Sequence, residues 1–120
     1  MNKKYNKKQL SSHIFTDREF DSIIKLVLSD IEYFYLSSNP HLTESQIDWL
    51  FLQDIDSVNI NLLRNKNCSK TKIEKFINLD DKIYNIAIAH NRTISQDIIT
   101  KLIAFNDTDV KCSLKLNNLI

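Results

Sequence analysis

Apolar residues return along most of this chain at a constant interval of 26 residues, and an asparagine returns with them. The asparagines are Asn39, Asn65, Asn91 and Asn117. The apolar positions in the same register include Ile47/Ile73/Ile99, Leu50/Phe76/Leu102 and Leu62/Ile88/Leu114. Self-similarity at a fixed period of this size is typical of repeat architectures, in which each unit buries its apolar face against its neighbours. The pattern therefore predicts similar units that pack side by side.

Each unit is predicted to contain two short helices separated by an acidic break. In the second unit, Thr43 and Gln46 have the spacing of a capping box, which satisfies free backbone N–H groups where a helix begins. Ile47 and Leu50 follow on one helical face. The segment 54–56, Asp-Ile-Asp, interrupts this face, and an aspartate there suits the start of a second helix. The apolar residues after the break again have helical spacing.

The repeating asparagine stands where the second helix of each unit ends. The chain contains no glycine, and Asn is the residue that most readily replaces glycine in the left-handed conformation. We therefore expect left-handed backbone at these asparagines. The second helices also carry Ile60, Ile86 and Cys112, about 200° from their first apolar face at ~100° per residue. A short helix that is apolar on two sides is normally sandwiched, so Cys112 is predicted to lie in the core. Cys68, which replaces Leu42 and Ile94 in the repeat register, is predicted to lie there as well.

These patterns divide the chain into a tail and one domain. Residues 1–12 are polar and basic, with Lys3, Lys4, Lys7 and Lys8, and are predicted to be a flexible tail, or else an arm that binds nucleic acid. Residues 13–120 are predicted to form a single domain. Its four repeats are expected at residues 13–38, 39–64, 65–90 and 91–117.

A family resemblance supports this division. The connector at residues 39–43, Asn-Pro-His-Leu-Thr, followed by a helix, an Asp-containing break and a helix that ends in Asn, resembles the leucine-rich repeat variant, a HEAT-like α-helical repeat. Lys66 and Arg92 depart from the proline of this connector. The resemblance covers about residues 39–120 and implies an all-α fold, an α-solenoid of about four helix-turn-helix repeats. It implies no catalytic residues.

Composition excludes several classes of function. The chain is 42% hydrophobic and 26% charged, and it has no apolar run of membrane-spanning length and no signal peptide, so we expect a cytoplasmic protein. Without glycine it cannot form the phosphate-binding loops and nucleophile turns that require this residue. His13, His41 and His90 lack the spacing of metal ligands. We therefore expect no enzyme, no metal and no cofactor.

Charge favours a basic partner. Between residues 17 and 63, nine acidic side chains face only Arg18 and Lys25, a net charge of −7, whereas the whole chain carries +1. An acidic surface attracts a basic protein and accelerates its association. The ridge of the second helices is predicted to face solvent, and it is basic only in the last two repeats, without aromatic side chains for base stacking. Nucleic acid is therefore the less favoured partner.

The candidate partner-binding residues come from four patterns. Trp49 and Leu52 stand where later repeats have Lys75 or Lys101 and Asn78 or Ala104, so they predict an apolar spot on the outer surface. This spot is either a contact for a partner or a second copy of the chain, or it is covered by the N-terminal segment or simply tolerated. The other patterns are the acidic half, the predicted ridge and an aromatic helix. Together the candidates are Tyr33, Asp48, Trp49, Leu52, Asp54, Asp56, Asn59, Leu63 and Asn85.

The predicted function is protein binding, because stacked helix pairs offer an extended surface. Asn, Ile and Lys are abundant, and lysine far outnumbers arginine. A small, partly acidic α-solenoid of this composition resembles the immunity proteins of interbacterial toxin systems, such as contact-dependent growth inhibition. That resemblance implies a basic toxin domain, such as a nuclease, as the partner. A nucleic-acid-binding solenoid and a general adaptor or assembly subunit are the alternatives.

Overall fold

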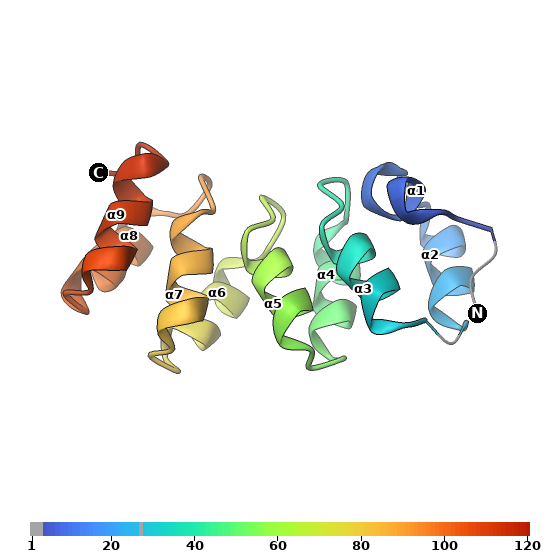
Figure 1. Ribbon diagram of the computed structural model, residues 1–120, viewed down its shortest axis with the longest axis horizontal. Helices are drawn as coiled ribbons and strands as arrows, with labels where there is room; N and C mark the ends of the chain where they lie inside the picture. Colours follow the sequence, from blue (N-terminus) through green and yellow to red (C-terminus); the bar gives the residue numbers. More distant parts are fainter. Residues whose placement is uncertain (1–3, 27) are drawn as a thin grey trace.

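The computed structural model describes residues 4–26 and 28–120. These residues form nine α-helices and no β-strand, which confirms the all-α prediction (Figure 1). The helices are α1 (Lys7–Ser12), α2 (Asp17–Ile24), α3 (Asp30–Ser37), α4 (Glu44–Phe51), α5 (Asp56–Leu63), α6 (Lys70–Ile77), α7 (Lys82–Ala89), α8 (Gln96–Ala104) and α9 (Thr108–Leu116). Lys3, one residue of the predicted tail, lies outside the described residues.

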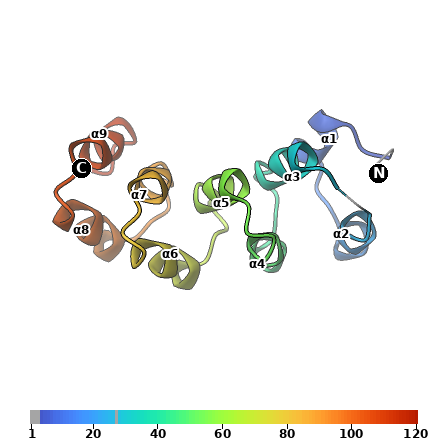
Figure 2. The same cartoon turned by 60° about the horizontal axis from the view of Figure 1, so that its bottom comes forward.

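The helices lie in two rows. The odd-numbered helices form one row, in which each packs against the next, and the even-numbered helices form the other (Figure 2). The molecule measures 45 × 22 × 21 Å along its principal axes. Figure 2 shows a shallow arc with the odd-numbered row on its inner side. We call the free side of this row the inner face, and the free side of the even-numbered row the outer face.

The chain reverses direction at two opposite edges of this body (Figure 1). One edge, here called the connector edge, contains residues 38–43, 64–69 and 90–95, which lead from an odd-numbered helix to an even-numbered one. The other, the break edge, contains residues 52–55, 78–81 and 105–107, which lead from an even-numbered helix to an odd-numbered one. The N-termini of α5, α7 and α9 consequently lie at the break edge and their C-termini at the connector edge.

Side-chain caps fix where the helices begin. The predicted capping box at the start of α4 is present: the Gln46 N–H donates to Thr43 Oγ1 at 3.2 Å, and the Thr43 N–H donates to Gln46 Oε1 at 3.0 Å. Asp81 and Asp107 cap α7 and α9 by accepting two backbone N–H groups each. Such a cap stabilises a helix by about 1 kcal/mol. The sequence pattern therefore places these starts correctly, but the expected aspartate cap of α5 is absent: its N-cap residue is Ile55, which makes no side-chain hydrogen bond to the helix.

Three left-handed residues lie at the break edge, and a fourth, Asn118 with φ 58°, follows α9, whereas the repeating Asn117 beside it has φ −96°. Asp54, Asp80 and Asn106 have φ angles of 55°, 51° and 56°. The expectation of left-handed backbone at the repeating Asn39, Asn65 and Asn91 is therefore wrong. Asn and Asp tolerate this conformation better than other residues with a Cβ, so they serve in a chain without glycine. The asparagines of the connectors have a different task, which uses their side chains.

Asn39, Asn65 and Asn91 are buried and form what we call the asparagine ladder. Each side-chain oxygen accepts the N–H of the residue two positions later, at 2.8 to 3.0 Å, and so closes the turn. The side-chain nitrogen of Asn65 donates to the Asn39 carbonyl at 2.9 Å, and that of Asn91 donates to the Asn65 carbonyl at 3.0 Å. The ladder therefore joins successive connectors to one another.

The first rung of the ladder corrects the prediction of a flexible tail. Within the predicted tail 1–12, residues 7–12 form α1, whose Leu10 is 1% exposed and whose helix packs against α3. Asn39 Nδ2 donates to the carbonyls of Leu10 and His13 at 3.0 and 2.7 Å. This segment, whose composition is that of a polar tail, is docked by the buried Leu10, by the Asn39 bonds and by Tyr5, which packs against Phe15 and donates to Glu19.

The core lies between the two rows and follows the predicted register. Leu36, Leu62, Ile88 and Leu114, one from each of α3, α5, α7 and α9, are all 0% exposed. The corresponding positions of α4, α6 and α8 are buried as well, with Ile47 at 0%, Ile73 at 3% and Ile99 at 5% exposure. The side of each odd-numbered helix that faces away from this core defines the inner face.

The shared core layer predicts the effect of shortening its side chains. Leu62→Ala or Ile88→Ala should each lower the free energy of unfolding by about 2–5 kcal/mol, because each leaves a cavity in a fully buried layer. Urea denaturation followed by circular dichroism measures the loss. Ser57→Ala, at an exposed position of α5, is the control and should change stability by less than about 0.5 kcal/mol. If either core variant lost no more stability than the Ser57→Ala control, the result would contradict the register.

The ladder predicts a loss from a nearly isosteric change. Asn65→Asp keeps an oxygen for the Asn67 N–H but removes the donor to the buried Asn39 carbonyl. We expect the free energy of unfolding to fall by ~1–3 kcal/mol, the usual cost of a buried polar group without its partner. Asn78→Asp, at an exposed position, is the matched control. A ladder without structural importance would make the two variants equally stable in thermal denaturation.

Candidate functional site

The predicted ridge of the second helices is buried. Asn59, Leu63 and Asn85 are 2%, 0% and 2% exposed, so their placement on a solvent-facing, partner-binding ridge is wrong. This side of α5 faces the next helix of its row, and Asn59 Nδ2 donates to Tyr84 Oη of α7 at 3.4 Å. An odd-numbered helix in the middle of the row has neighbours on both flanks as well as a core behind it, and that leaves one narrow side for solvent.

Trp49 and Leu52 do not form one exposed apolar spot, because α2 covers part of Trp49 and leaves Leu52 exposed. Trp49 is half-buried, and its ring packs edge-to-face against Phe20 of α2 with centroids 6.0 Å apart. Leu52, at the end of α4, remains 73% exposed. The residues next to them on α4 include Asp48, which is half-buried and has one carboxylate oxygen without a hydrogen-bond partner in the described part of the chain. Trp49 therefore belongs to the packing between α2 and α4.

The remaining candidates lie on the odd-numbered helices or at the break edge. Tyr33 is half-buried on α3, and burial raises the pKa of its hydroxyl. Asp54 is exposed in the left-handed turn before α5. Asp56 is exposed at the first residue of α5 and accepts a hydrogen bond of 2.6 Å from the Tyr84 hydroxyl of α7. Burial, followed by this bond, raises the pKa of Tyr84.

A row of apolar side chains that the ridge prediction misses lies on the inner face. Phe34, Ile60, Ile86 and Cys112 occupy the same position in α3, α5, α7 and α9, and we call them the inner strip. At ~100° per residue, Ile60 lies about 180° from the midpoint of Val58 and Leu62, which are 0% exposed. Phe34 is 39% exposed, Ile60 and Ile86 are partly exposed, and Cys112 is exposed.

The inner strip corrects two predictions about the second apolar side of these helices. Ile60, Ile86 and Cys112 are not sandwiched between helices, and Cys112 is not a core residue, whereas Cys68 is buried as predicted. The sequence signal for the strip is the 26-residue recurrence itself. More exposed apolar residues adjoin the strip on the same helices, with exposures of 51 to 70%. They are Ile31, Ile83 and Leu116.

The outer face is polar by comparison. Its exposed positions on α2, α4, α6 and α8 are mostly charged or hydroxylated, and several are paired with one another. Lys70 Nζ lies 2.6 Å from the Asp97 carboxylate, and Lys101 Nζ lies 3.4 Å from the Glu74 carboxylate. The exposed polar residues of these helices are Asp17, Arg18, Asp21, Ser22, Glu44, Ser45, Lys70, Thr71, Lys75, Gln96, Asp97, Thr100 and Lys101. The two faces thus differ in chemistry, and the apolar one is the inner face.

Charge is also divided between the two edges. The break edge and the first residues of the helices that follow it carry acidic side chains, and the connector edge carries basic ones. The acidic residues are Asp54, Asp56, Asp80, Asp81, Asp107 and Asp109, and the basic ones are Arg64, Lys66 and Arg92. Aspartates at helix N-termini and cations at C-termini are favoured by the helix dipole. Lys82 interrupts the acidic edge but is held by Asp109 at 2.6 Å.

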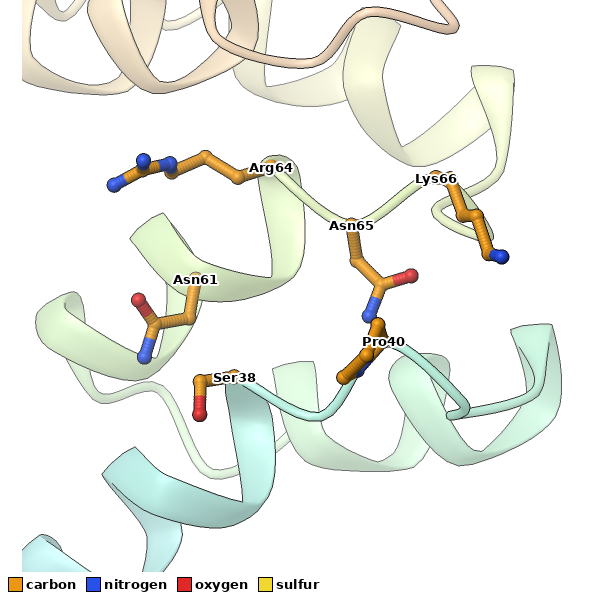
Figure 3. A pocket seen from close by; sticks show the side chains of 6 residues that line it. All are labelled: Ser38, Pro40, Asn61, Arg64, Asn65 and Lys66. Carbon is orange, nitrogen blue, oxygen red and sulfur yellow. The ribbon is translucent and has the colours of Figure 1, made fainter. Parts of the chain in front are cut away.

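A pocket of about 460 Å³ opens where the inner face meets the connector edge (Figure 3). It lies between the C-terminal ends of α3 and α5, and its lining residues are Ser38, Pro40, Asn61, Arg64, Asn65 and Lys66. The side-chain nitrogens of Asn61 and Asn65 already donate to protein oxygens. Arg64 and Lys66 form no ion pair with any carboxylate of the described residues, so their charges are available to a ligand.

Other chemistry has little support in the described segments. No group of three or more His, Cys, Asp or Glu side chains within residues 4–26 and 28–120 is arranged to hold a metal ion. No helix among them is long and apolar enough to cross a membrane. His90, between Arg64 and Asn117, has its pKa lowered mainly by burial and then by the Arg64 charge.

No protein family, curated protein or solved structure matches the chain in sequence or structure comparisons.

The two cysteines should differ strongly in reactivity. Burial, followed by the nearby Asp48 charge, raises the pKa of Cys68 to about 12, so at pH 8 only ~0.01% of this thiol is the reactive thiolate. Cys112 is exposed on the inner strip. We expect one thiol per chain to react with Ellman's reagent in the native protein, at least a hundredfold faster than the second.

Substitution identifies the reactive thiol. The fast phase should disappear in Cys112→Ser and persist in Cys68→Ser. A fast phase that survives the Cys112→Ser change would come from Cys68 and would contradict the burial of that thiol.

Proposed function

We propose that the chain is an α-solenoid of 26-residue helix-turn-helix repeats that binds another protein on its inner face. The repeat assignment is supported by contacts that recur with the sequence. The ladder bonds Asn65–Asn39 and Asn91–Asn65 both join residues 26 positions apart, and the left-handed Asp54, Asp80 and Asn106 recur at the same interval. The pairs α4/α5, α6/α7 and α8/α9 are three such repeats, and the α2/α3 pair is an atypical first one.

The inner strip carries the binding assignment. Four successive odd-numbered helices keep an apolar residue on the side that faces solvent: Phe34 and Cys112 are exposed, and Ile60 and Ile86 are half-buried against the core. Exposed apolar surface of this extent, bordered by charged residues, marks protein interaction sites. The outer face, with Lys75 and Lys101 at its centre, has none of this character. The partner therefore docks its apolar side chains along the strip.

The favoured partner is a basic toxin domain, and the protein acts as its cytoplasmic inhibitor. The support is electrostatic: the acidic break edge borders the strip, and residues 17–63 carry a net charge of −7. A toxic nuclease presents a basic active site, and an acidic protein that covers it blocks substrate entry. An adaptor would use the same face but would not neutralise a toxin.

Photo-crosslinking from the inner face tests the binding surface. A photoreactive phenylalanine analogue is placed at Ile60 or Ile86, and at Lys75 of the outer face as the control, in cells that naturally produce the protein. The two strip positions should crosslink to the same protein and Lys75 to none. In the reconstituted complex, Ile86→Asp should weaken binding at least tenfold without lowering the melting temperature. Leu52→Asp, at another exposed apolar residue, should leave affinity unchanged. Crosslinks from Lys75 alone would overturn the assignment.

Growth rescue tests the toxin assignment separately. The protein is co-expressed with a basic nuclease toxin domain that binds it in vitro, and it should restore growth, whereas the Ile86→Asp variant should fail to do so. Association should slow as salt rises, because the attraction acts between surface charges. A partner that crosslinks to the strip but is harmless to cells would retain the binding function and reject the role in immunity.

A further inference from the structure

The spacing of the inner strip restricts what can lie along it. Adjacent packed helices are ~8–10 Å apart, so the strip presents an apolar side chain at about this interval. An α-helix repeats a side chain on one face every seven residues, about 10.5 Å. An extended β-strand places side chains on one face at ~6.7 or ~13 Å and does not match. A polyproline II chain rises about 9.3 Å over three residues, so it matches the spacing as well as an α-helix does.

The width of the strip distinguishes the two matching conformations. Asp56 begins α5 and Arg64 follows its last residue, so the acidic and basic borders lie eight residues apart, about 12 Å along the helix axis. An α-helix with its side chains is about 10–12 Å wide and fills this space. Polyproline ligands are bound in grooves lined by aromatic rings. Within the inner strip only Phe34 is aromatic. Spacing and width together therefore select a helix.

The borders of the strip have opposite charge. Toward the break edge lie Asp30, Asp54 and Asp56, and toward the connector edge lie Arg64 and Lys66 with their unpaired charges. The pocket of Figure 3 opens beside Arg64, with Asn61 on its wall. It is large enough for a carboxylate side chain from a helix that lies on the strip. A bound helix is thus stabilised by basic residues on one flank and acidic residues on the other.

We propose that the partner presents an amphipathic α-helix along the row from α3 to α9, with apolar residues seven positions apart, basic residues against the break edge and acidic residues against Arg64 and Lys66. This inference rests on the proposed function and adds the chemistry of the partner. The arrangement of charges on the bound helix also determines its direction along the row. If its basic and acidic flanks are exchanged, the helix can keep its apolar side on the strip and its charges paired only by running in the opposite direction.

Designed peptides test the inference without the natural partner. Three 24-residue helical peptides, about 36 Å long, have the same composition and the same apolar heptad positions. The flanks are defined by looking at the apolar side of the peptide with its N-terminus at the top. The first peptide has lysines on the left flank and glutamates on the right, and the second has the two exchanged. The third has both charges mixed on both flanks. Binding is measured by fluorescence anisotropy. Energy transfer between a dye on the peptide N-terminus and a dye on a Thr100→Cys variant, on the outer face of α8 and in a Cys112→Ser background, then reports direction. A proline-rich peptide with apolar residues three apart is the fourth ligand.

The two segregated peptides should bind at least tenfold more tightly than the mixed one, and their N-termini should lie at opposite ends of the row. A double Arg64→Glu and Lys66→Glu change should weaken both at least fivefold, and Arg18→Glu on the outer face should not. Equal binding of the mixed peptide, a common direction or tighter binding of the proline-rich peptide would overturn the helix inference. If the strip still crosslinks to a partner in that case, the proposed function stands. Absence of strip crosslinks would overturn the proposed function instead.

Discussion

The hydrogen bond from a connector asparagine to the carbonyl of the preceding connector asparagine sets the geometry of this molecule. Both groups are buried, so neither can exchange its partner for water without cost. Because the same side chain also closes its own turn, each rung fixes the position of a connector and its distance from the previous one. Equivalent residues of successive helices consequently face the same way, and single apolar side chains become a continuous strip.

Local electrostatics and the surface of the molecule are linked by the same geometry. Asp81 and Asp107 cap helix N-termini, and every such end of the odd-numbered row after α3 lies at the break edge. Arg64 stands at a helix C-terminus at the connector edge. Residues chosen for the stability of short helices thereby border the inner strip with charges of opposite sign. The charge borders need no separate explanation, although a partner can exploit them.

The periodicity of the sequence correctly predicted those positions that have the same packing partner in every repeat. Leu62 and Ile88 occupy one repeat position, and this position is in the core of each repeat because the even-numbered row always lies behind it. Periodicity could not assign Leu63 or Ile60, because it reports an angle around the helix and not what fills the space there. Leu63 is fully buried on the side of α5 that faces α7, whereas Ile60 packs only partly against the core and keeps an exposed side. Leu10 was missed since one leucine in a polar segment has no period, and its burial depends on a docking site created by α3 and Asn39.

The range of the contacts has a consequence for how the molecule folds and moves. Side-chain bonds between helix pairs connect residues about one repeat apart, such as Asn61 with Ser37 or Asn91 with Asn65. Few contacts require the chain to close a long loop, so folding can start at any adjacent pair and spread outward at a high rate. The same short range limits how far a perturbation spreads. A change in packing at one helix pair acts first on the pairs beside it, so distant repeats are coupled only through those that lie between them.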